Sequence, residues 1–348
     1  MKTEFLALDG VSDLTEALRP AADIIKQGGL VVFPTETVYG LGADATSSEA
    51  AAKIYAAKGR PSDNPLIIHI SEPEWAEKYA FTNEAYYKLA KSFMPGPLTV
   101  VLRARDSIPT QTRGGLPTVA VRCPSNLAAR TLIALSGVPI AAPSANISGS
   151  PSPTRADHVR DDMEGRVDMI IDGGECDFGL ESTIVSVNDD NSVTMLRPGK
   201  ITISDIEAMG LRCFVADAVT SKLSEGQRPL SPGMKDRHYA PKSPVVLIDG
   251  EFPQIIDYIK AENKNNIAII AFTEYCQLAG NVFPLADIYD FSMQEDKVGQ
   301  AHKLFSILRD ADKKNYEVIY APLPSTDGIG LALYNRMIRA AAYRIIKL

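Results

Sequence analysis

The stretch Gly28-Gly29-Leu30-Val31-Val32-Phe33-Pro34-Thr35-Glu36-Thr37-Val38-Tyr39-Gly40-Leu41-Gly42 joins a short apolar strand to a turn rich in hydroxyl groups and glycines. The sequence Lys58-Gly59-Arg60-Pro61-Ser62 follows and places two cations beside a glycine and a proline. Proteins of the α/β class bind ligands in polar, glycine-rich loops at strand ends. Because two fixed cations favour an anionic ligand such as a phosphate, this part of the chain predicts a ligand site as well as an α/β fold.

Length and composition indicate a globular protein of two domains. The chain has 348 residues, of which 45% are hydrophobic and 23% are charged, and this length exceeds that of a typical single domain. No run approaches the roughly 18 apolar residues of a membrane-spanning helix, and the N-terminus lacks the apolar core of a signal peptide. The four cysteines form no CxxC pair, which makes a zinc site or a disulfide framework improbable. We therefore expect a cytoplasmic protein.

The charge balance limits the possible partners. The formal net charge is -7, which argues against nucleic-acid binding driven by the charge of the whole surface. A local basic groove is compatible with this negative net charge.

Apolar periodicity predicts alternating helices and strands before residue 216. We expect helices at 13–27, 48–57, 84–93 and 127–136, and strands at 30–33, 66–70, 98–102, 119–122, 139–142, 167–172, 182–187 and 193–196. Several neighbouring strands lack a helix between them, which favours a mixed sheet over a purely parallel one.

The sequence after residue 215 predicts a linker and a smaller domain. Residues 216–243 have the Ser, Pro and Gly content of a linker, but the segment 231–241 within them is rich in Lys, Arg, His and Tyr, which is typical of a ligand contact. Strands at 245–248, 267–272 and 318–320 and helices at 252–260, 299–309 and 334–346 then predict a doubly wound α/β domain. The predicted domains are thus residues 1–215 and 244–348.

Polar groups recur in the loops at the predicted strand ends. They include Thr35, Glu36, Thr37, Ser144, Asn146, Ser182, Thr183 and Arg197. Arg122 ends an apolar strand that Thr118 precedes, and an arginine there needs a partner because burying an unpaired charge is costly. A substrate carboxylate would be one such partner. His69 lies within another strand, where a hydrogen-bonded core histidine is an equally good interpretation.

Motifs of several enzyme classes are absent, and the remaining groups suit chemistry at phosphorus. The sequence has no GxxxxGK[ST], HExxH, EF-hand or GxSxG pattern. Phosphoryl and nucleotidyl transfer need cations and hydrogen-bond donors around the developing oxyanion charge, commonly with magnesium. No spacing of carboxylates identifies metal ligands, so the metal site stays unknown.

Taken together, these motifs resemble the YrdC-type threonylcarbamoyl-AMP synthases. The resemblance lies in the stretch 28–42, Lys58-Gly59-Arg60-Pro61, Ser144-Ala145-Asn146, Ser182-Thr183-Ile184-Val185 and Arg197-Pro198-Gly199. Residues 231–241 and 328–341 resemble the long, two-domain form. The resemblance implies a twisted mixed α/β sheet, the YrdC-like domain, followed by a linker and a smaller Rossmann-like domain.

The resemblance also implies a function. L-threonine, bicarbonate (or CO2) and ATP would give L-threonylcarbamoyl-AMP and pyrophosphate by adenylyl transfer, with Mg²⁺ accompanying ATP. A partner transferase would then move the threonylcarbamoyl group to adenosine 37 of tRNAs that read codons beginning with A.

The site residues carried over from the family fall into two groups. The L-threonine contacts would be Thr35, His69, Arg122, Ala142 and Ser182, with Arg122 pairing with the threonine carboxylate. The ATP contacts would be Lys58, Ser62, Thr118, Ser144, Asn146, Ser152, Arg197 and Tyr239. Lys58 and Arg60 would be the catalytic residues that neutralise the phosphates. Tyr239 lies in the linker, which we expect to cross the active site as a lid, and Asp236 departs from the family pattern.

Two alternatives stay open at this point. A module that binds double-stranded RNA or tRNA without turnover is compatible with the cationic loops, but the acidic total and the lack of interleaved aromatic residues disfavour it. A carbamoyl-AMP-forming relative used in hydrogenase maturation would carry zinc-finger and acylphosphatase-like domains, for which this chain has neither the cysteines nor the length. The oligomeric state and the role of the C-terminal domain are not predicted.

Overall fold

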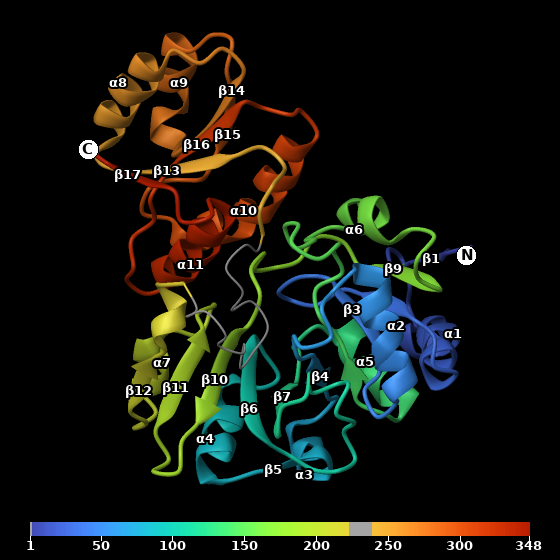
Figure 1. Cartoon of the computed structure of the whole chain (residues 1–348). Coiled ribbons are helices and arrows are strands. Elements are labelled where there is room, and N and C mark those ends of the chain that lie inside the picture. The colour runs from blue at the N-terminus through green and yellow to red at the C-terminus, as the bar shows by residue number, and fades with distance from the viewer. Residues whose placement is uncertain (1, 223–238) are drawn as a thin grey trace. The chain divides into compact units, whose positions relative to one another are not determined.

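A computed structural model describes residues 2–222 and 239–348, which form two compact units (Figure 1). The first unit comprises residues 2–148 and 152–222, and the second comprises residues 149–151 and 239–348. Most of the predicted linker 216–243, including Asp236, lies outside the described residues. No helix in the described ranges is long and apolar enough to cross a membrane.

The strands described in the first unit form one mixed sheet. In chain order they are β1 (Glu4–Ala7), β2 (Val31–Phe33), β3 (Gly40–Asp44), β4 (Ile67–His69), β5 (Ala80–Phe81), β6 (Leu98–Ala104), β7 (Thr118–Arg122), β8 (Ile140–Ala141), β9 (Met169–Asp172), β10 (Thr183–Val187), β11 (Val193–Arg197) and β12 (Cys213–Val215). Their order across the sheet is β1-β9-β2-β3-β8-β4-β7-β6-β10-β11-β12, and β5 pairs with β6. The sheet contains parallel pairs such as β4 with β7 and antiparallel pairs such as β6 with β7.

Short helices accompany this sheet. They are α1 (Leu14–Lys26), α2 (Ser48–Lys58), α3 (Ala76–Tyr79), α4 (Glu84–Phe93), α5 (Leu127–Ser136), α6 (Ala156–Met163) and α7 (Ile203–Glu207), with single 3₁₀ turns η1 (Pro73–Trp75) and η2 (Asp217–Val219). Local signals set the ends of α2, where the Ser47 side chain accepts a hydrogen bond from Ala50 N and Gly59 adopts a left-handed φ of 63°.

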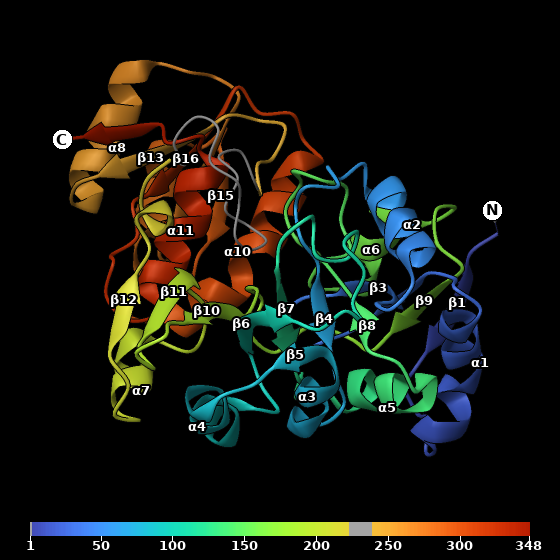
Figure 2. The ribbon, with the colours of Figure 1, turned by 60° about the horizontal axis from the view of Figure 1, so that its bottom comes forward.

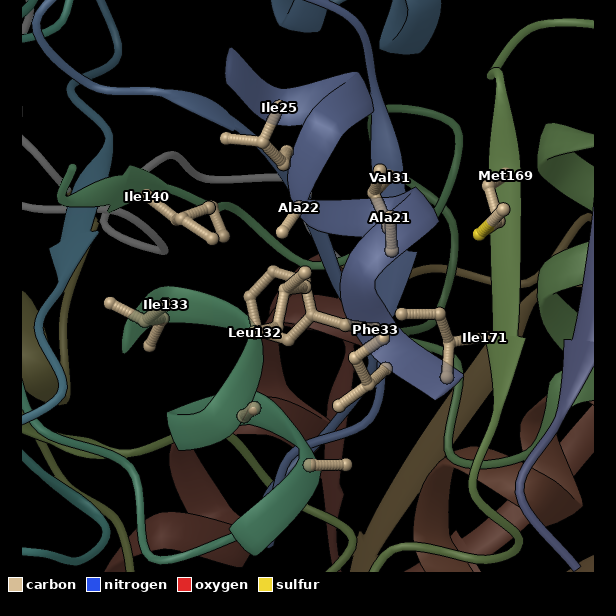
Figure 3. Packing of buried hydrophobic residues seen from close by; sticks show 14 residues of the cluster. Ala21, Ala22, Ile25, Val31, Phe33, Leu132, Ile133, Ile140, Met169 and Ile171 are labelled. Atoms are coloured by element: carbon tan, nitrogen blue, oxygen red, sulfur yellow. The ribbon is translucent and has the colours of Figure 1, made fainter. Parts of the chain in front are cut away.

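The main core lies between α1, α5 and the sheet (Figures 2 and 3). The side chains that Figure 3 labels in this cluster are Ala21, Ala22, Ile25, Val31, Phe33, Leu132, Ile133, Ile140, Met169 and Ile171. Small alanines on α1 let the two helices approach closely, and the cluster holds β2 and β8 in place behind the polar loops that follow them.

The second unit is a parallel sheet covered by helices on both faces. Its strands are β13 (Val245–Asp249), β14 (Ile267–Ala271), β15 (Asp287–Asp290), β16 (Val318–Pro322) and β17 (Ile345–Lys347), in the order β15-β14-β16-β13-β17. Figure 1 shows α8 (Phe252–Glu262) and α9 (Thr273–Val282) on one face and α10 (Lys297–Asp312) and α11 (Gly330–Ala340) on the other. The predicted fold class, a mixed sheet followed by a smaller doubly wound domain, is thus confirmed.

Two local predictions were wrong. The predicted helix 334–346 ends at Ala340, because Ala342 and Tyr343 have positive φ angles of 49° and 65° and the chain then continues as β17 beside β13. Residues 40–42 were interpreted as part of a turn, yet they belong to β3, which lies between β2 and β8. A Cβ on Gly42 would lie 2.7 Å from the Phe33 ring, so this glycine permits close packing within the strand.

Candidate functional site

The loop after β2 is held by the Thr35 hydroxyl. Its oxygen accepts hydrogen bonds from the backbone N–H groups of Thr37 (3.1 Å) and Val38 (3.2 Å), and it lies 2.6 Å from the Val38 carbonyl oxygen. It is also 2.8 Å from the Thr37 hydroxyl. These bonds fold the backbone into a tight hydroxyl-stabilised turn, which fixes the direction of Glu36.

Glu36 and Arg122 form a buried ion pair. The Arg122 Nη2 donates to Glu36 Oε1 at 2.7 Å and to the Thr37 hydroxyl at 2.8 Å. The two charged side chains are only 5% and 8% exposed, respectively for the arginine and the glutamate. The protein therefore supplies a carboxylate partner for Arg122, which sequence reasoning had assigned only to the substrate.

Strand register places a row of polar residues across the sheet. His69 pairs with Arg122 between β4 and β7, Arg122 pairs with Thr99 between β7 and β6, and a further pair links Ile184 on β10 to Arg197 on β11. Since Thr99 is also opposite Ile184, the residues lie in one line over five strands. Directly opposed residues share a face of the sheet, so His69, Arg122, Thr99 and Arg197 lie along one face. With the apolar Ile184 between Thr99 and Arg197, they form what we call the polar row.

Ser182 joins the far end of this row. Arg197 donates from Nε to the Ser182 carbonyl oxygen and from Nη2 to the Ser182 hydroxyl, both at 3.1 Å. The Thr99 hydroxyl is 2.8 Å from the same Ser182 hydroxyl. The backbone of Gly199 comes so close to Thr183 that a Cβ there would lie 2.5 Å from the Thr183 nitrogen. The predicted threonine contact Ser182 and the predicted ATP contact Arg197 are thus in direct contact.

Burial and charge keep His69 neutral. Burial and then the Arg122 guanidinium lower the pKa of His69 to about 3, because both disfavour the imidazolium. Its ring lies edge-on to Phe33, with centroids 6.1 Å apart. Ala142, another predicted threonine contact, is buried in the core cluster beside Phe33.

Lys58 holds the loop that follows β8. This lysine is 1% exposed, and its Nζ donates to the carbonyl oxygens of Ser144 and Asn146. The Ser144 hydroxyl donates to the Asn146 Oδ1 at 2.5 Å, and the Ser148 N–H donates to the Lys58 carbonyl oxygen at 2.9 Å. The structure therefore brings together three of the predicted ATP contacts.

The other predicted ATP contacts are placed separately. The Ser152 hydroxyl is buried and donates to Glu181 Oε1 at 2.5 Å, and Ser62 is exposed in the turn after α2. Thr118 begins β7 and Arg122 ends it, so the two lie about 13 Å apart at ~3.3 Å per residue. Tyr239 belongs to the second unit.

Two further predicted residues make contacts of their own. Arg60 donates from Nε to the Asn64 carbonyl oxygen (3.3 Å) and from Nη2 to the Pro65 carbonyl oxygen (3.0 Å). The Tyr239 ring lies 5.2 Å from that of Phe305 and 5.6 Å from the Arg336 guanidinium. Within residues 2–222 and 239–348, no group of three or more His, Cys, Asp or Glu side chains could hold a metal ion.

Sequence reasoning missed the roles of Glu36, Thr37 and Thr99 in this network. The useful signal was the arginine in an apolar strand, since a buried guanidinium needs a carboxylate. The sequence does not single out Glu36 as that carboxylate, because 86 residues separate the two groups in the chain.

The mixed sheet with its buried cations, followed by a parallel-sheet unit, defines a class of two-domain YrdC-like α/β proteins. A family profile described as "Telomere recombination" matches residues 23–199, and one described as "Threonylcarbamoyl-AMP synthase, C-terminal domain" matches residues 201–342. The chain belongs to the threonylcarbamoyl-AMP synthase family, in its long two-domain form, which confirms the resemblance.

Individual relatives match 95% or more of the chain. The threonylcarbamoyl-AMP synthase of Pyrococcus abyssi is 44% identical over 338 residues, 95% of each chain. That of Bacillus subtilis is 39% identical over 354 residues, 100% of each chain. The crystal structure of P. abyssi Sua5 complexed with L-threonine matches with a TM-score of 0.89 at 39% identity, and the match covers 100% of both chains.

Proposed function

We propose that this chain is a threonylcarbamoyl-AMP synthase that converts L-threonine, bicarbonate and ATP into L-threonylcarbamoyl-AMP and pyrophosphate. The observation that carries the proposal is the match of both domains, over the full chain, to synthases of this name. The buried guanidinium of Arg122 among hydroxyl groups supports it, since an amino-acid substrate needs a fixed cation for its carboxylate.

Threonine is proposed to bind along the polar row. Arg122 binds the carboxylate, and Thr35, His69, Ala142 and Ser182 surround the rest of the molecule. Arg122 is suited to this because its contacts to Glu36 and Thr37 use only Nη2, and a guanidinium has five N–H donors. The neutral His69 can exchange a hydrogen bond with an uncharged group such as the threonine hydroxyl.

ATP is proposed to bind at the loop that Lys58 holds and at Arg197. Ser144, Asn146 and Ser152 are near the phosphates or ribose in this arrangement, together with Ser62 and Thr118. The role of Tyr239 as an ATP contact stays a prediction from the sequence. Lys58 and Arg60 neutralise phosphate charge while their bonds to backbone carbonyl oxygens keep them in position. Such pre-positioned charge stabilises the transition state without reorganisation at the moment of reaction.

Mg²⁺ is proposed to enter as the ion of the MgATP substrate. One oxygen of Glu36 pairs with Arg122, one oxygen of Glu181 accepts from Ser152, and no group of three or more His, Cys, Asp or Glu side chains within the described residues could hold a metal ion. The described residues therefore do not fit a metal site formed by the protein alone, and the phosphates would supply most of the ligands.

The reaction requires two bond-forming steps. The neutral threonine amine adds to CO2 and gives a carbamate, and a carbamate oxygen then attacks the α-phosphorus in line while pyrophosphate leaves. Positioning the two substrates beside each other supplies much of the acceleration. A transferase is proposed to carry the product to adenosine 37 of tRNA in the cytoplasm.

Pyrophosphate release tests this proposal. The protein is incubated with ATP, Mg²⁺ and bicarbonate, with and without L-threonine, and release is expected only when threonine and bicarbonate are both present. Lys58→Ala and Arg60→Ala should lower the rate, whereas Lys53→Ala, an exposed lysine on the same helix as Lys58, should not. Release that ignores threonine would contradict the proposed substrate. Salt-dependent RNA binding with no release would favour the alternative of an RNA-binding module.

A further inference from the structure

Three buried polar atoms near the polar row lack hydrogen-bond partners among the described residues. They are Glu36 Oε2, Arg122 Nε and His69 Nδ1. Buried polar atoms are nearly always satisfied in folded proteins, and leaving one unsatisfied costs free energy. A ligand that supplies both a donor and an acceptor would remove this cost.

The unsatisfied atoms of the ion pair match an α-amino acid. Arg122 Nε is a donor that suits a substrate carboxylate, and Glu36 Oε2 is an acceptor that suits an ammonium group. In an α-amino acid these two groups are attached to the same carbon. A carboxylate bound by Arg122 therefore keeps its ammonium close to the guanidinium, where Glu36 lies 2.7 Å from Nη2.

The proposed reaction needs a proton acceptor in this position, because an ammonium group has no lone pair with which to attack CO2. Four titratable groups near Glu36 or its partner, which are His69, Cys123, Cys176 and Arg122 itself, are poor acceptors. Burial and Arg122 lower the pKa of His69 to about 3, so it binds a proton only weakly. Burial raises the pKa of the Cys123 thiol to about 12 and raises that of Cys176 as well, so both stay protonated, and Arg122 is a cation.

We propose that Glu36 binds the threonine ammonium through Oε2 and takes its proton, as the general base of carbamate formation. This inference rests on the proposed function. An ammonium N–H bond breaks, an O–H bond forms on Glu36, and the freed lone pair forms the N–C bond to CO2. The nitrogen then loses a second proton to give the carbamate, and the dehydration of bicarbonate to CO2 and water consumes one of the two protons. In total, threonine ammonium and bicarbonate give the carbamate, one water and one proton, and Glu36 passes that proton to solvent before the next turnover.

The test compares Glu36→Gln with the unchanged protein in the pyrophosphate assay. Glutamine keeps the size and a hydrogen-bond acceptor but cannot take the proton at neutral pH. General-base catalysis contributes about 10²- to 10⁴-fold, so kcat of Glu36→Gln should fall by at least about 100-fold at pH 7. The affinity for L-threonine, measured by calorimetry without ATP, should change much less.

The pH profile separates a base from a merely structural residue. In Glu36→Gln the activity should rise about tenfold per pH unit above pH 7, since the neutral fraction of an amine rises by that factor below its pKa. The unchanged protein should show a shallower rise, and Glu36→Asp should regain activity with a profile like that of the unchanged protein. Glu16→Gln, which removes an exposed partner of Arg19, is the control and should match the unchanged protein.

Each outcome decides a separate point. A Glu36→Gln variant with near-normal kcat, or with a loss that is the same at every pH, would overturn the role as a base. If Glu36→Gln does not fold, a Glu36→Asp variant that folds and binds threonine but shows no activity at any pH would overturn it as well. If the unchanged protein releases no pyrophosphate with threonine and bicarbonate, the proposed function itself is wrong, and this inference with it.

Discussion

Replacing Arg122 by methionine should destabilise the first unit strongly, because it leaves Glu36 buried without its counter-ion. The paired atoms are 2.7 Å apart and the two side chains are at most 8% exposed. Two unit charges about 4 Å apart interact by about 4 kcal/mol at an effective dielectric constant of ~20. Removing one partner of a buried pair typically costs about 3–5 kcal/mol, and we expect a loss of this size in the free energy of unfolding.

The double variant Arg122→Met/Glu36→Gln should recover most of this loss. With both charges gone, no uncompensated ion is buried, and such replacements are often close to neutral. We expect the double variant to be destabilised by only about 1–2 kcal/mol, so that the coupling energy between the two sites is about 2 kcal/mol or more.

Urea denaturation followed by tryptophan fluorescence measures this cycle. The chain has one tryptophan, Trp75, which packs against the main core cluster of the first unit. Its signal therefore reports unfolding of the unit that contains the ion pair. A double variant as unstable as Arg122→Met alone would refute the reasoning, since the cost would then not arise from an unpaired Glu36.

Further predictions concern stability and activity. Lowering the pH from 7 to 5 should reduce the free energy of unfolding by about 2 kcal/mol through His69. The unfolded chain binds a proton at this histidine below about pH 6.5, whereas the folded chain binds it only near the lowered pKa of about 3. Urea titrations of His69→Gln should lack this part of the pH dependence. Gly199→Ala should lower the free energy of unfolding by about 1–3 kcal/mol, since the new Cβ would lie 2.5 Å from the Thr183 nitrogen. Thermal denaturation measures this, and Gly280→Ala, at a helical position with open space around it, is the control that should not destabilise the protein. Lys58→Met should lower kcat in the pyrophosphate assay by about tenfold or more, and an unchanged kcat would argue against its role. Chelation of Mg²⁺ should abolish release and added Mg²⁺ should restore it, whereas full activity in chelator would contradict the MgATP substrate.

Local sequence signals predicted several of the helices, although α6, α7 and α9 were not predicted. Helices α4 and α5 have the predicted bounds, and the asparagines before them, Asn83 and Asn126, accept hydrogen bonds from backbone N–H groups of the first turn. Local signals did not predict strand β3, because glycines such as Gly40 and Gly42 are typical of turns. Only the pairing of these residues with β2 and β8 makes them a strand. The same holds for β17, since only pairing with β13 makes the last residues a strand.

The site was predicted in its residue types but not in its contacts. The loops after β2 and β8 and the arginine at the end of β7 were all identified as polar groups at strand ends. The bonds from Lys58 to the carbonyl oxygens of the loop after β8, and the pairing of Glu36 with Arg122, join residues 85 or more positions apart. Such contacts follow from the order of strands in the sheet, which spacing along the sequence does not determine.

Mass spectrometry of the product formed from carbon-13 bicarbonate, L-threonine and ATP tests the central claim most directly. We predict a nucleotide with the mass of threonylcarbamoyl-AMP that carries a single carbon-13 atom and forms together with pyrophosphate. A nucleotide product without the label, or ATP consumption that yields no threonine-containing nucleotide, would contradict the account.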